Sequence, residues 1–514
     1  MVTAINERNR KWWVVVAMAL ATILITLDFG GVMILLPTIG RELDTSTTGL
    51  QWTANAYLLA FAVVMVAAGR LADIFGRRLL LLVGIAIFIV ASSLCGLAQA
   101  DWWLIAARAV QGLGAGVFLT ASLSIVSNAF PPDEQSKGIG VWAGVIGVGI
   151  AVGPFVGGFL AEVASWRWFF FVNIPIALLS VFLTLRVVRE SRDETTEHHV
   201  DLFGLITVTA GLTALVFGIQ QSETLGWGSA FVIGTLVVAA ILLALFVFVE
   251  LRLREPLIDL LLFANRGYLG ANAVAFAQNF GFGAAMFFLT LYLQYALDYS
   301  PLEAGLVFLP LTALFTIGNL QAGRLASTIG PRLPMAGGMA LIATAFLLLA
   351  LVTPTSGLGI VVVALVIAGV GQALAYTIST TAGMAAIPAA KAGAASGVLQ
   401  MVRQVGVVFG VAVPGAFFKA LENSKLAELL TAAGARLDTS DRAEIRGLLS
   451  GSEAAETKLV QLAPAVADQV EQVVREAFVY AFDGAMVLCA LVSVAGVMTS
   501  FLVAKGASQN KQAG

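Results

Sequence analysis

Fourteen apolar runs, each about as long as a membrane-crossing helix, divide the sequence from end to end. They leave little of the chain for a soluble domain, because 59% of the residues are hydrophobic and 12% are charged, whereas soluble proteins contain about 25% charged residues. The runs therefore exclude a cytosolic enzyme and predict an all-α polytopic membrane protein. The predicted spans are 13–36, 50–70, 79–99, 103–127, 139–161, 169–189, 202–221, 229–250, 268–296, 303–325, 334–353, 359–381, 394–418 and 478–504.

Basic residues in the connections predict the orientation, because short cytoplasmic connections are enriched in Lys and Arg. Eighteen of the 29 Lys and Arg residues lie in the N-terminus, the even-numbered connections and the C-terminus, whereas the short odd-numbered loops contain Arg41 and Arg167. We therefore expect a multi-pass protein of the cell (inner) membrane with both termini in the cytoplasm. The net charge of −2 gives no indication of a nucleic-acid partner.

An internal repeat relates the two ends of the chain. The sequence GRLADIFGRR at 69–78 matches GRLASTIGPR at 323–332, an offset of 254 residues, and glycine pairs in later helices match at an offset of 257. Helices 1–6 thus correspond to helices 9–14, with helices 7 and 8 inserted between them. Two parallel halves with a substrate site between them, near the membrane midplane, are typical of transporters. The matching glycines are Gly112 with Gly369, Gly114 with Gly371, Gly149 with Gly406, and Gly153 with Gly410.

The repeat also predicts the domain organisation. We expect an N-terminal six-helix half at 1–190, a linker with two additional transmembrane helices at 191–255, and a C-terminal six-helix half at 256–514. The C-terminal half includes segment 419–477, whose charges and roughly helical spacing of leucines predict amphipathic helices outside the membrane. The sequence leaves open whether this segment is a lid or a solvated hairpin.

Two ionisable residues lie inside the predicted first and fourth helices. Arg108 needs a partner, because an arginine at the centre of a spanning helix costs about 2.5–3.5 kcal/mol. We interpret Asp28 as the only carboxylate well inside a predicted span, and hence as this partner. Burial favours a protonated carboxyl and a neighbouring guanidinium an ionised one, so Asp28 can exchange a proton as the conformation changes. The alternatives are an Arg108 that extends to the outer headgroups and a purely structural pair.

Two glycine-containing motifs each have a functional and a structural interpretation. In 69–78, charges at the turn between helices 2 and 3 can form an ion-pair latch or simply a solvated loop. In helix 5, small residues permit close packing and a proline bends the helix, so a packing seam is sufficient to explain them. The residues of the first motif are Gly69, Asp73, Gly76, Arg77 and Arg78, and those of the second are Gly149, Gly153, Pro154, Gly157 and Gly158.

Polar residues on several predicted helices are candidates for the lining of a substrate cavity. Taken alone, each is more often a group that hydrogen-bonds between helices. The candidates are Asn55, Tyr57, Gln278, Asn279, Tyr292, Gln294, Gln372, Tyr376, Gln400, Arg403 and Gln404.

Together these motifs resemble those of the major facilitator superfamily, and more closely its fourteen-helix drug:proton antiporter family, over essentially the whole chain. GRLADIFGRR resembles the signature between helices 2 and 3, LIAARAVQGLGAG (104–116) the helix 4 motif, GIAVGPFVGG (149–158) the helix 5 antiporter motif, and LDFGGVMILLP (27–37) the helix 1 motif. The resemblance implies the major facilitator fold, proton transfer at Arg108, and an acidic coupling role for Asp28. It also implies that the helix 2–3 motif gates the carrier.

The function implied by the resemblance is proton-coupled efflux of lipophilic, amphipathic small molecules by alternating access. We expect no enzyme activity, cofactor or metal, the coupling ion being the proton, and a monomer that works among membrane lipids. No HExxH, GxSxG or GxxxxGK[ST] motif occurs in the sequence. Two alternatives stay open: a dedicated exporter of a single metabolite, lipid or siderophore, and a non-transporting membrane sensor.

Departures from the family pattern bear on the charge of the substrate. Gly30 and Met33 stand where Thr and Asn are frequent in helix 1, and helices 10 and 13 lack the acids of members that export multivalent cations. Helix 13 carries Arg403 instead. We therefore expect lipophilic monocations or neutral amphiphiles to be preferred over dications, because each unpaired charge is expensive to desolvate. Arg403 could even favour an anionic or zwitterionic group.

Overall fold

The computed structural model describes residues 7–131, 135–191, 201–253, 256, 258–353, 357–388, 392–432 and 464–503, which form helices and no strands. The prediction of an all-α membrane protein is confirmed. The helices of spanning length or their parts are α1 (Glu7–Leu43), α2 (Thr47–Phe75), α3 (Arg77–Gly96), α4 (Asp101–Ala129), α5 (Gln135–Val163), α6 (Trp166–Val187), α7 (Leu202–Leu225), α8 (Ala230–Glu250), α9 (Arg266–Ala284), α10 (Pro301–Val307), α11 (Leu309–Ile329), α12 (Arg332–Leu349), α13 (Leu358–Ala385), α14 (Ala392–Ala432) and α17 (Pro464–Ser500).

Every predicted span coincides with one helix or with a broken one. Among the described residues, twelve helical segments are long and apolar enough to cross a membrane. The remaining long helices, α2 and α5, contain 29 residues each and correspond to predicted spans 50–70 and 139–161. The chain is therefore a multi-pass membrane protein.

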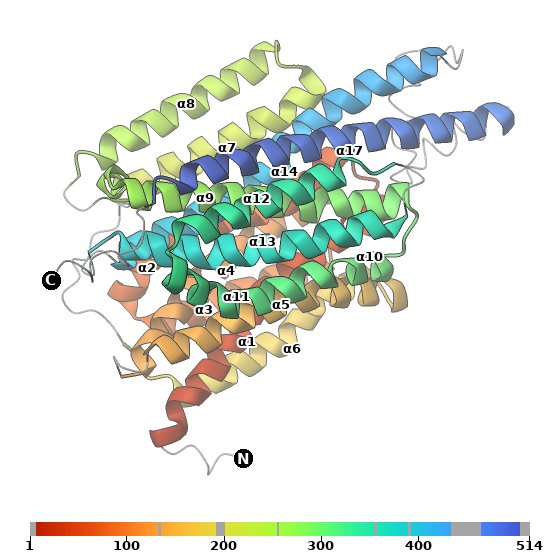
Figure 1. Cartoon of the computed structure of the whole chain (residues 1–514). Helices are drawn as coiled ribbons and strands as arrows, with labels where there is room; N and C mark the ends of the chain where they lie inside the picture. Colours follow the sequence, from red (N-terminus) through yellow and green to blue (C-terminus); the bar gives the residue numbers. More distant parts are fainter. Residues whose placement is uncertain are drawn as a thin grey trace.

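Helix packing divides the bundle into two six-helix halves. In the N-terminal half, α1 packs on α5 and α6, and α4 packs on α2 and α3. In the C-terminal half, α9 packs on α14 in the way that α1 packs on α5, and α13 packs on α11 and α12. The additional helices α7 and α8 pack on each other, and α7 contacts both α2 and α14 (Figure 1). The inserted pair thus lies along the seam between the halves.

Two predicted spans are less regular than the sequence suggests. The run 303–325 is broken at Phe308 into α10 and α11, because Pro310 at the second position of α11 starts a new helix more readily than it continues one. The run 268–296 begins as α9 and continues as π-helical turns at Ala285–Leu289 and Tyr292–Ala296. Asp298, with a φ of 55°, ends this helix.

The expected amphipathic helices of segment 419–477 are continuations of membrane-spanning helices. Residues 419–432 extend α14 and residues 464–477 begin α17, so both helices project beyond their neighbours (Figure 1). A small separate apolar cluster joins the two extensions, and residues 433–463 lie outside the described part of the chain. The cluster contains Leu426, Leu430, Val470, Val473, Val474 and Ala477.

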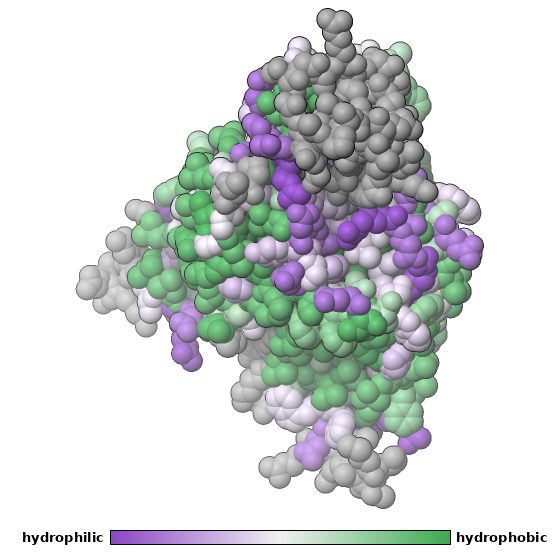
Figure 2. Space-filling view, turned by 90° about the vertical axis from the view of Figure 1, so that its right-hand side faces the viewer, coloured by the Kyte–Doolittle hydropathy of each residue, from purple (hydrophilic) through white to green (hydrophobic). Residues whose placement is uncertain are grey.

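The bundle has two ends, which we name the α10 end and the α3 end. Helices α2, α4, α6 and α10 begin at the α10 end, and α3, α5, α9 and α12 begin at the α3 end. Hydrophilic residues gather across the α10 end, whereas hydrophobic residues cover its flanks (Figure 2). Helix α8 illustrates these flanks, because Phe231, Val237, Ile241 and Phe248 are all exposed on it. Such a band of exposed apolar side chains suits contact with lipid.

Candidate functional site

A buried ion pair joins α1 to α4. Arg108 Nη1 lies 2.5 Å from Asp28 Oδ2, and the two side chains are 2% and 0% exposed. Gln111, one turn further along α4, donates to Asp28 Oδ1 at 3.0 Å and accepts from Arg108 Nη1 at 2.7 Å. Arg108 Nε also donates to the carbonyl oxygen of Thr53 in α2. The guanidinium thus lies inside the bundle, paired with Asp28, and does not extend toward headgroups.

Glycines in α4 allow the close packing that positions this pair. A Cβ on Gly112 would overlap the carbonyl of Tyr57 in α2, and a Cβ on Gly114 would lie 2.7 Å from the amide nitrogen of Phe88 in α3. The guanidinium carbon of Arg108 consequently lies 4.1 Å from the centre of the Tyr57 ring. Tyr57 also faces the cavity at the centre of the bundle, so this ring contacts both the pair and the cavity.

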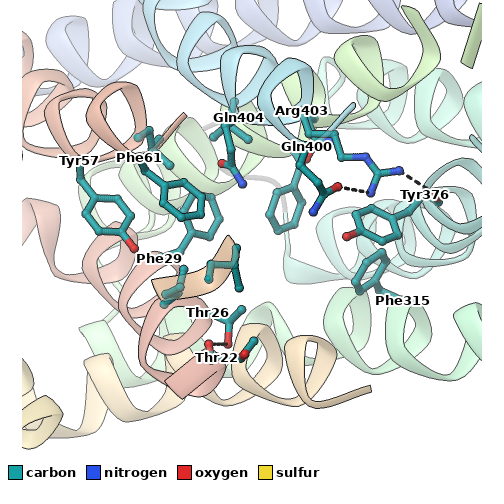
Figure 3. Close-up of a pocket in the computed structure, with 16 residues that line it drawn as sticks. Thr22, Thr26, Phe29, Tyr57, Phe61, Phe315, Tyr376, Gln400, Arg403 and Gln404 are labelled. Atoms are coloured by element: carbon teal, nitrogen blue, oxygen red, sulfur yellow. Dashed lines mark hydrogen bonds between the residues drawn. The ribbon is translucent and has the colours of Figure 1, made fainter. Parts of the chain in front are cut away.

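The central cavity lies between the two halves and has a volume of about 110 Å³. Sites for drug-sized ligands typically measure about 300–1,000 Å³, so the cavity in this conformation is smaller than such a site. Aromatic residues of α1 and α2 lie on one side of the cavity, and the polar residues of α14 lie opposite (Figure 3). The lining residues are Thr22, Ile25, Thr26, Phe29, Tyr57, Leu58, Phe61, Leu119, Asn279, Phe282, Phe315, Tyr376, Gln400, Arg403, Gln404 and Val407.

Among the described residues that line the cavity, Arg403 is the one that carries a formal charge. It is 2% exposed, and its guanidinium carbon lies 3.8 Å from the centre of the Tyr376 ring. Its Nη2 donates to the Tyr376 carbonyl at 2.9 Å, and its Nη1 donates to the Gln400 amide oxygen (Figure 3). Nη2 also donates to hydroxyls of α13. No carboxylate of the described residues pairs with it.

The predicted cavity residues separate into two groups. Tyr57, Asn279, Tyr376, Gln400, Arg403 and Gln404 line the central cavity. The others lie outside its lining, because their polar groups hydrogen-bond to the backbone or to each other, or are enclosed between helices. These are Asn55, which is fully buried; Gln278 and Gln372, which hydrogen-bond to each other; Tyr292, which donates to the Thr353 carbonyl; and Gln294, which donates to the Ile34 carbonyl.

The helix 5 motif makes two different contacts. Gly153 and Gly157 face α1, where a Cβ on either would lie 2.8 Å from a carbonyl oxygen of that helix; Gly149 also faces α1, at Thr26. Gly158 instead faces the C-terminal half, since a Cβ there would lie 2.7 Å from Leu302 Cα of α10. The Pro154 carbonyl approaches Gly305 of α10 in the same way. The motif therefore packs the N-terminal half and also closes the halves together at the α10 end.

The helix 2–3 motif forms a turn of a single residue. Gly76, with a φ of 112°, separates α2 from α3, a conformation that favours glycine. The Glu190 carboxylate, which follows α6, accepts from the amides of Arg78 and Leu79 at 3.0 and 3.1 Å. A carboxylate at this position also interacts favourably with the helix dipole of α3. Gly69 lies in α2 near Thr120 of α4. The backbone amide of Arg77 donates to the Ser191 carbonyl. The side chain of Asp73 lies outside the described part of the chain.

Several residues of the site were missed from the sequence. Gln111 lies one turn after Arg108, a spacing that could have revealed it, whereas Thr22, Phe29 and Phe315 carry no signal that separates cavity from core. The interpretation of Asp28 as the only carboxylate well inside a span is wrong. Asp483 of α17 also lies within a segment, Gln472–Ser500, that is long and apolar enough to cross a membrane.

Comparison with known proteins identifies relatives of the whole bundle. The model of the Major Facilitator Superfamily matches residues 18–411. The chain is 33% identical over 408 residues to the tetracenomycin C resistance and export protein of Streptomyces glaucescens, covering 79% of this chain and 76% of that protein. It is 36% identical over 406 residues to the multidrug resistance protein Stp of Mycobacterium tuberculosis, covering 79% and 75%.

A longer match reaches nearly both ends of the chain. The probable actinorhodin transporter of Streptomyces coelicolor is 31% identical over 529 aligned positions, covering 96% of this chain and 91% of that protein. Among solved structures, a bacterial homolog of the human lysosomal transporter Spinster, inward-facing and unoccupied, superposes with a TM-score of 0.66. That likeness covers 96% of this chain and 98% of that one at 18% identity, so it shows the fold alone.

Proposed function

Because the chain belongs to the Major Facilitator Superfamily of membrane transporters, as its motifs predicted, we propose that it exports lipophilic, amphipathic small molecules in exchange for protons. Relatives named for resistance and export support efflux rather than uptake. The two halves, at 1–190 and 256–514, alternate in opening toward either side of the membrane, with the segment 191–255 between them.

The observation that carries the proposal is the buried Asp28–Arg108 pair. When Asp28 is ionised, Arg108 and Gln111 satisfy both of its oxygens inside the bundle. A proton on Asp28 removes this charge and weakens the contact that ties α1 to α4. Since α1 and α2 line the cavity beside the pair, protonation changes the position of the walls that hold the substrate.

The α10 end faces outward in this proposal. Basic side chains at the α3 end support this orientation, because cytoplasmic connections are enriched in them. The close contacts of α5 with α10 then form an outer gate, which is closed in the described conformation. The basic residues at the α3 end are Arg77, Arg78, Arg186, Arg252, Arg266 and Arg332.

Proton flow supplies enough free energy for this export. One charge that crosses 100 mV releases about 2.3 kcal/mol, and about 1.4 kcal/mol corresponds to a tenfold ratio. At roughly 150 mV, one proton per cycle supports a substrate gradient of a few hundredfold.

Reconstitution tests the proposal directly. The full chain in proteoliposomes is expected to move an amphiphilic dye only when an inward-directed proton gradient is imposed, and a protonophore is expected to stop it. Substrate addition should in turn release protons into the vesicle buffer. Dye movement that is independent of the proton gradient would refute the coupling, and a lack of any transport would refute the exporter.

A dedicated exporter is the second candidate, favoured by relatives named for single antibiotics such as tetracenomycin C and actinorhodin. Efflux assays with chemically unrelated amphiphiles distinguish the two. Export of several classes supports a multidrug carrier, and export of one supports the dedicated carrier.

A further inference from the structure

We propose that the central cavity binds amphiphiles with an acidic group, a carboxylate or an ionised hydroxyl, and that Arg403 receives this group. The inference rests on the proposed export function and deepens it by assigning a charge class to the substrate. It starts from the contrast between the charge of Arg403 and its hydrogen-bond partners among the described residues, all of which are neutral.

The hydrogen bonds of Arg403 leave its charge uncompensated. Its partners are the Tyr376 carbonyl, the hydroxyls of Ser379 and Thr380 at 3.1 and 2.6 Å, and the Gln400 amide oxygen at 3.3 Å. Its Nε is buried and has no hydrogen-bond partner in the part of the chain that the structure describes. Burial of a guanidinium without a counter-ion raises the free energy of the folded protein, and hydrogen bonds to neutral groups offset only part of this increase.

A carboxylate is the group that best completes this site. The planar guanidinium presents parallel N–H donors that match two carboxylate oxygens, and such charge-assisted bonds are stronger than bonds between neutral groups. The Asp28 carboxylate is not available to Arg403, since Arg108 and Gln111 hold both of its oxygens and it is not among the residues that line the cavity. The ligand must therefore bring the negative charge.

The opposite wall accommodates the apolar part of such a ligand. Phe29, Tyr57 and Phe61 lie across the cavity from Arg403 and present aromatic surface (Figure 3). Thr22 and Thr26 offer hydroxyls on the same side, but no charge. A cation placed here would meet only neutral dipoles and the positive charge of Arg403. Lining and charge together select a molecule with an aromatic body and an acidic end.

Three probes with a common body test the inference: 4-hexylbenzoate, 4-hexylbenzamide and 4-hexylbenzylammonium. Binding to the full chain in nanodiscs is measured by equilibrium dialysis, and binding to empty nanodiscs is subtracted. We expect the benzoate to bind about 10-fold to 100-fold more tightly than the benzamide, the range expected for a charged hydrogen bond. The benzylammonium should bind most weakly.

Variants of Arg403 separate recognition from structure. Arg403→Gln is expected to remove the preference for the benzoate while changing benzamide affinity less than about threefold. Arg403→Lys should keep part of the benzoate preference, because it keeps the charge but not the planar guanidinium. Arg475→Gln is the matched control, because Arg475 contacts Asp298 and the Ala296 carbonyl at the α10 end, away from the cavity. Equal binding of benzoate and benzamide to the unmodified chain would overturn the inference even if the Gln variant does not fold. An equal loss of both in Arg403→Gln would overturn it as well.

Transport of the same probes distinguishes this failure from failure of the proposed function. Benzoate binding that depends on Arg403, without any proton-driven transport, would preserve the inference and refute the exporter. Proton-driven transport of the benzamide and the benzylammonium, with no benzoate preference in binding, would preserve the exporter and refute the inference.

Discussion

Each half of the bundle contains a buried arginine that packs on a tyrosine ring, and the two arginines differ in whether a carboxylate pairs with them. In the N-terminal half, Arg108 lies 4.1 Å from the centre of the Tyr57 ring and pairs with Asp28. In the C-terminal half, Arg403 lies 3.8 Å from the centre of the Tyr376 ring and has neutral partners. Helix α9, which packs on α14 as α1 packs on α5, contains no Asp or Glu that could supply a counter-ion.

Under the proposed function, this difference assigns proton coupling to the N-terminal half and recognition of the substrate's charge to the C-terminal half. The paired arginine belongs to a closed network whose charge changes only when a proton arrives or leaves. Arg403, which no described carboxylate pairs with, lines the cavity, so a ligand that enters the cavity can interact with its charge. The sequence repeat therefore conserved the framework while the charged residues diverged: at the offset of 257, Arg108 corresponds to Leu365 and Arg403 to Ile146.

The largest expected effect is the loss of proton-driven transport in Asp28→Asn. The amide has nearly the volume of the acid but cannot exchange a proton, so transport under an imposed pH gradient should fall to the level of empty vesicles. Asp483→Asn is the control, because it changes another carboxylate inside a span, in α17. It should transport as the unmodified chain does. Full proton-driven transport by a correctly inserted Asp28→Asn would remove the basis for contrasting the halves.

Stability should distinguish the two arginines next. Arg108→Gln leaves the buried Asp28 unpaired and is expected to lower the free energy of unfolding by about 3–5 kcal/mol. Arg403→Gln leaves neutral acceptors without a donor but also removes a buried charge that no described carboxylate pairs with, so it should cost less than Arg108→Gln. Denaturant unfolding in detergent measures both. The double variant Asp28→Asn with Arg108→Gln should cost less than the sum of the single changes, and simple additivity would argue against a coupled pair.

A smaller effect is expected when Arg108 is replaced by lysine. The guanidinium reaches Asp28, Gln111 and the Thr53 carbonyl at once, and a lysine ammonium cannot reproduce this planar arrangement. Proton-driven transport by Arg108→Lys should fall about tenfold, the equivalent of one charged hydrogen bond. Initial rates in proteoliposomes of equal protein content provide the measurement. A lysine variant with unaltered rates would mean that only the charge matters at this position.

The smallest effect concerns substrate charge in the cation series. A dication needs two compensating charges, and the described cavity lining offers none, so monovalent quaternary ammonium compounds should compete with the transported dye a few times better than divalent ones of matched lipophilicity. Arg403→Gln should narrow this difference. Better competition by the divalent members of the series would show that the cavity compensates cations in a way that its lining residues do not reveal.

The sequence predicts the framework of this molecule well because the membrane imposes it. The lengths of the apolar runs predict the spans. An arginine inside a span requires a partner, and this requirement predicts Asp28 as the partner of Arg108. The break at Phe308 was not predicted, because Pro310 is as compatible with a bent helix as with two helices. The continuation of α14 and α17 beyond their apolar runs was also missed.

The cavity lining is harder to predict, because polar side chains in spans have two uses. Gln278 and Gln372 satisfy each other, and Gln294 reaches the Ile34 carbonyl across the halves, whereas Gln400 and Gln404 face the cavity. Spacing along one helix cannot separate these cases, since each depends on which group a neighbouring helix brings opposite. The same holds for Phe29, whose ring would suit a packed core equally well.

In the proposed transport cycle the contact of α5 with α10 is the outer gate, and its structure bears on the speed of that cycle. It is made by backbone atoms around Gly158 and Gly305, which have no rotamers with which to adapt, so the surfaces either meet completely or separate. Replacement of either glycine by alanine should therefore push the two helices apart and shorten the lifetime of the closed gate. Because neither glycine lines the cavity, such a change alters the turnover rate without altering the chemical selection of the cargo. Rate and selectivity are thus adjustable at separate places in the chain.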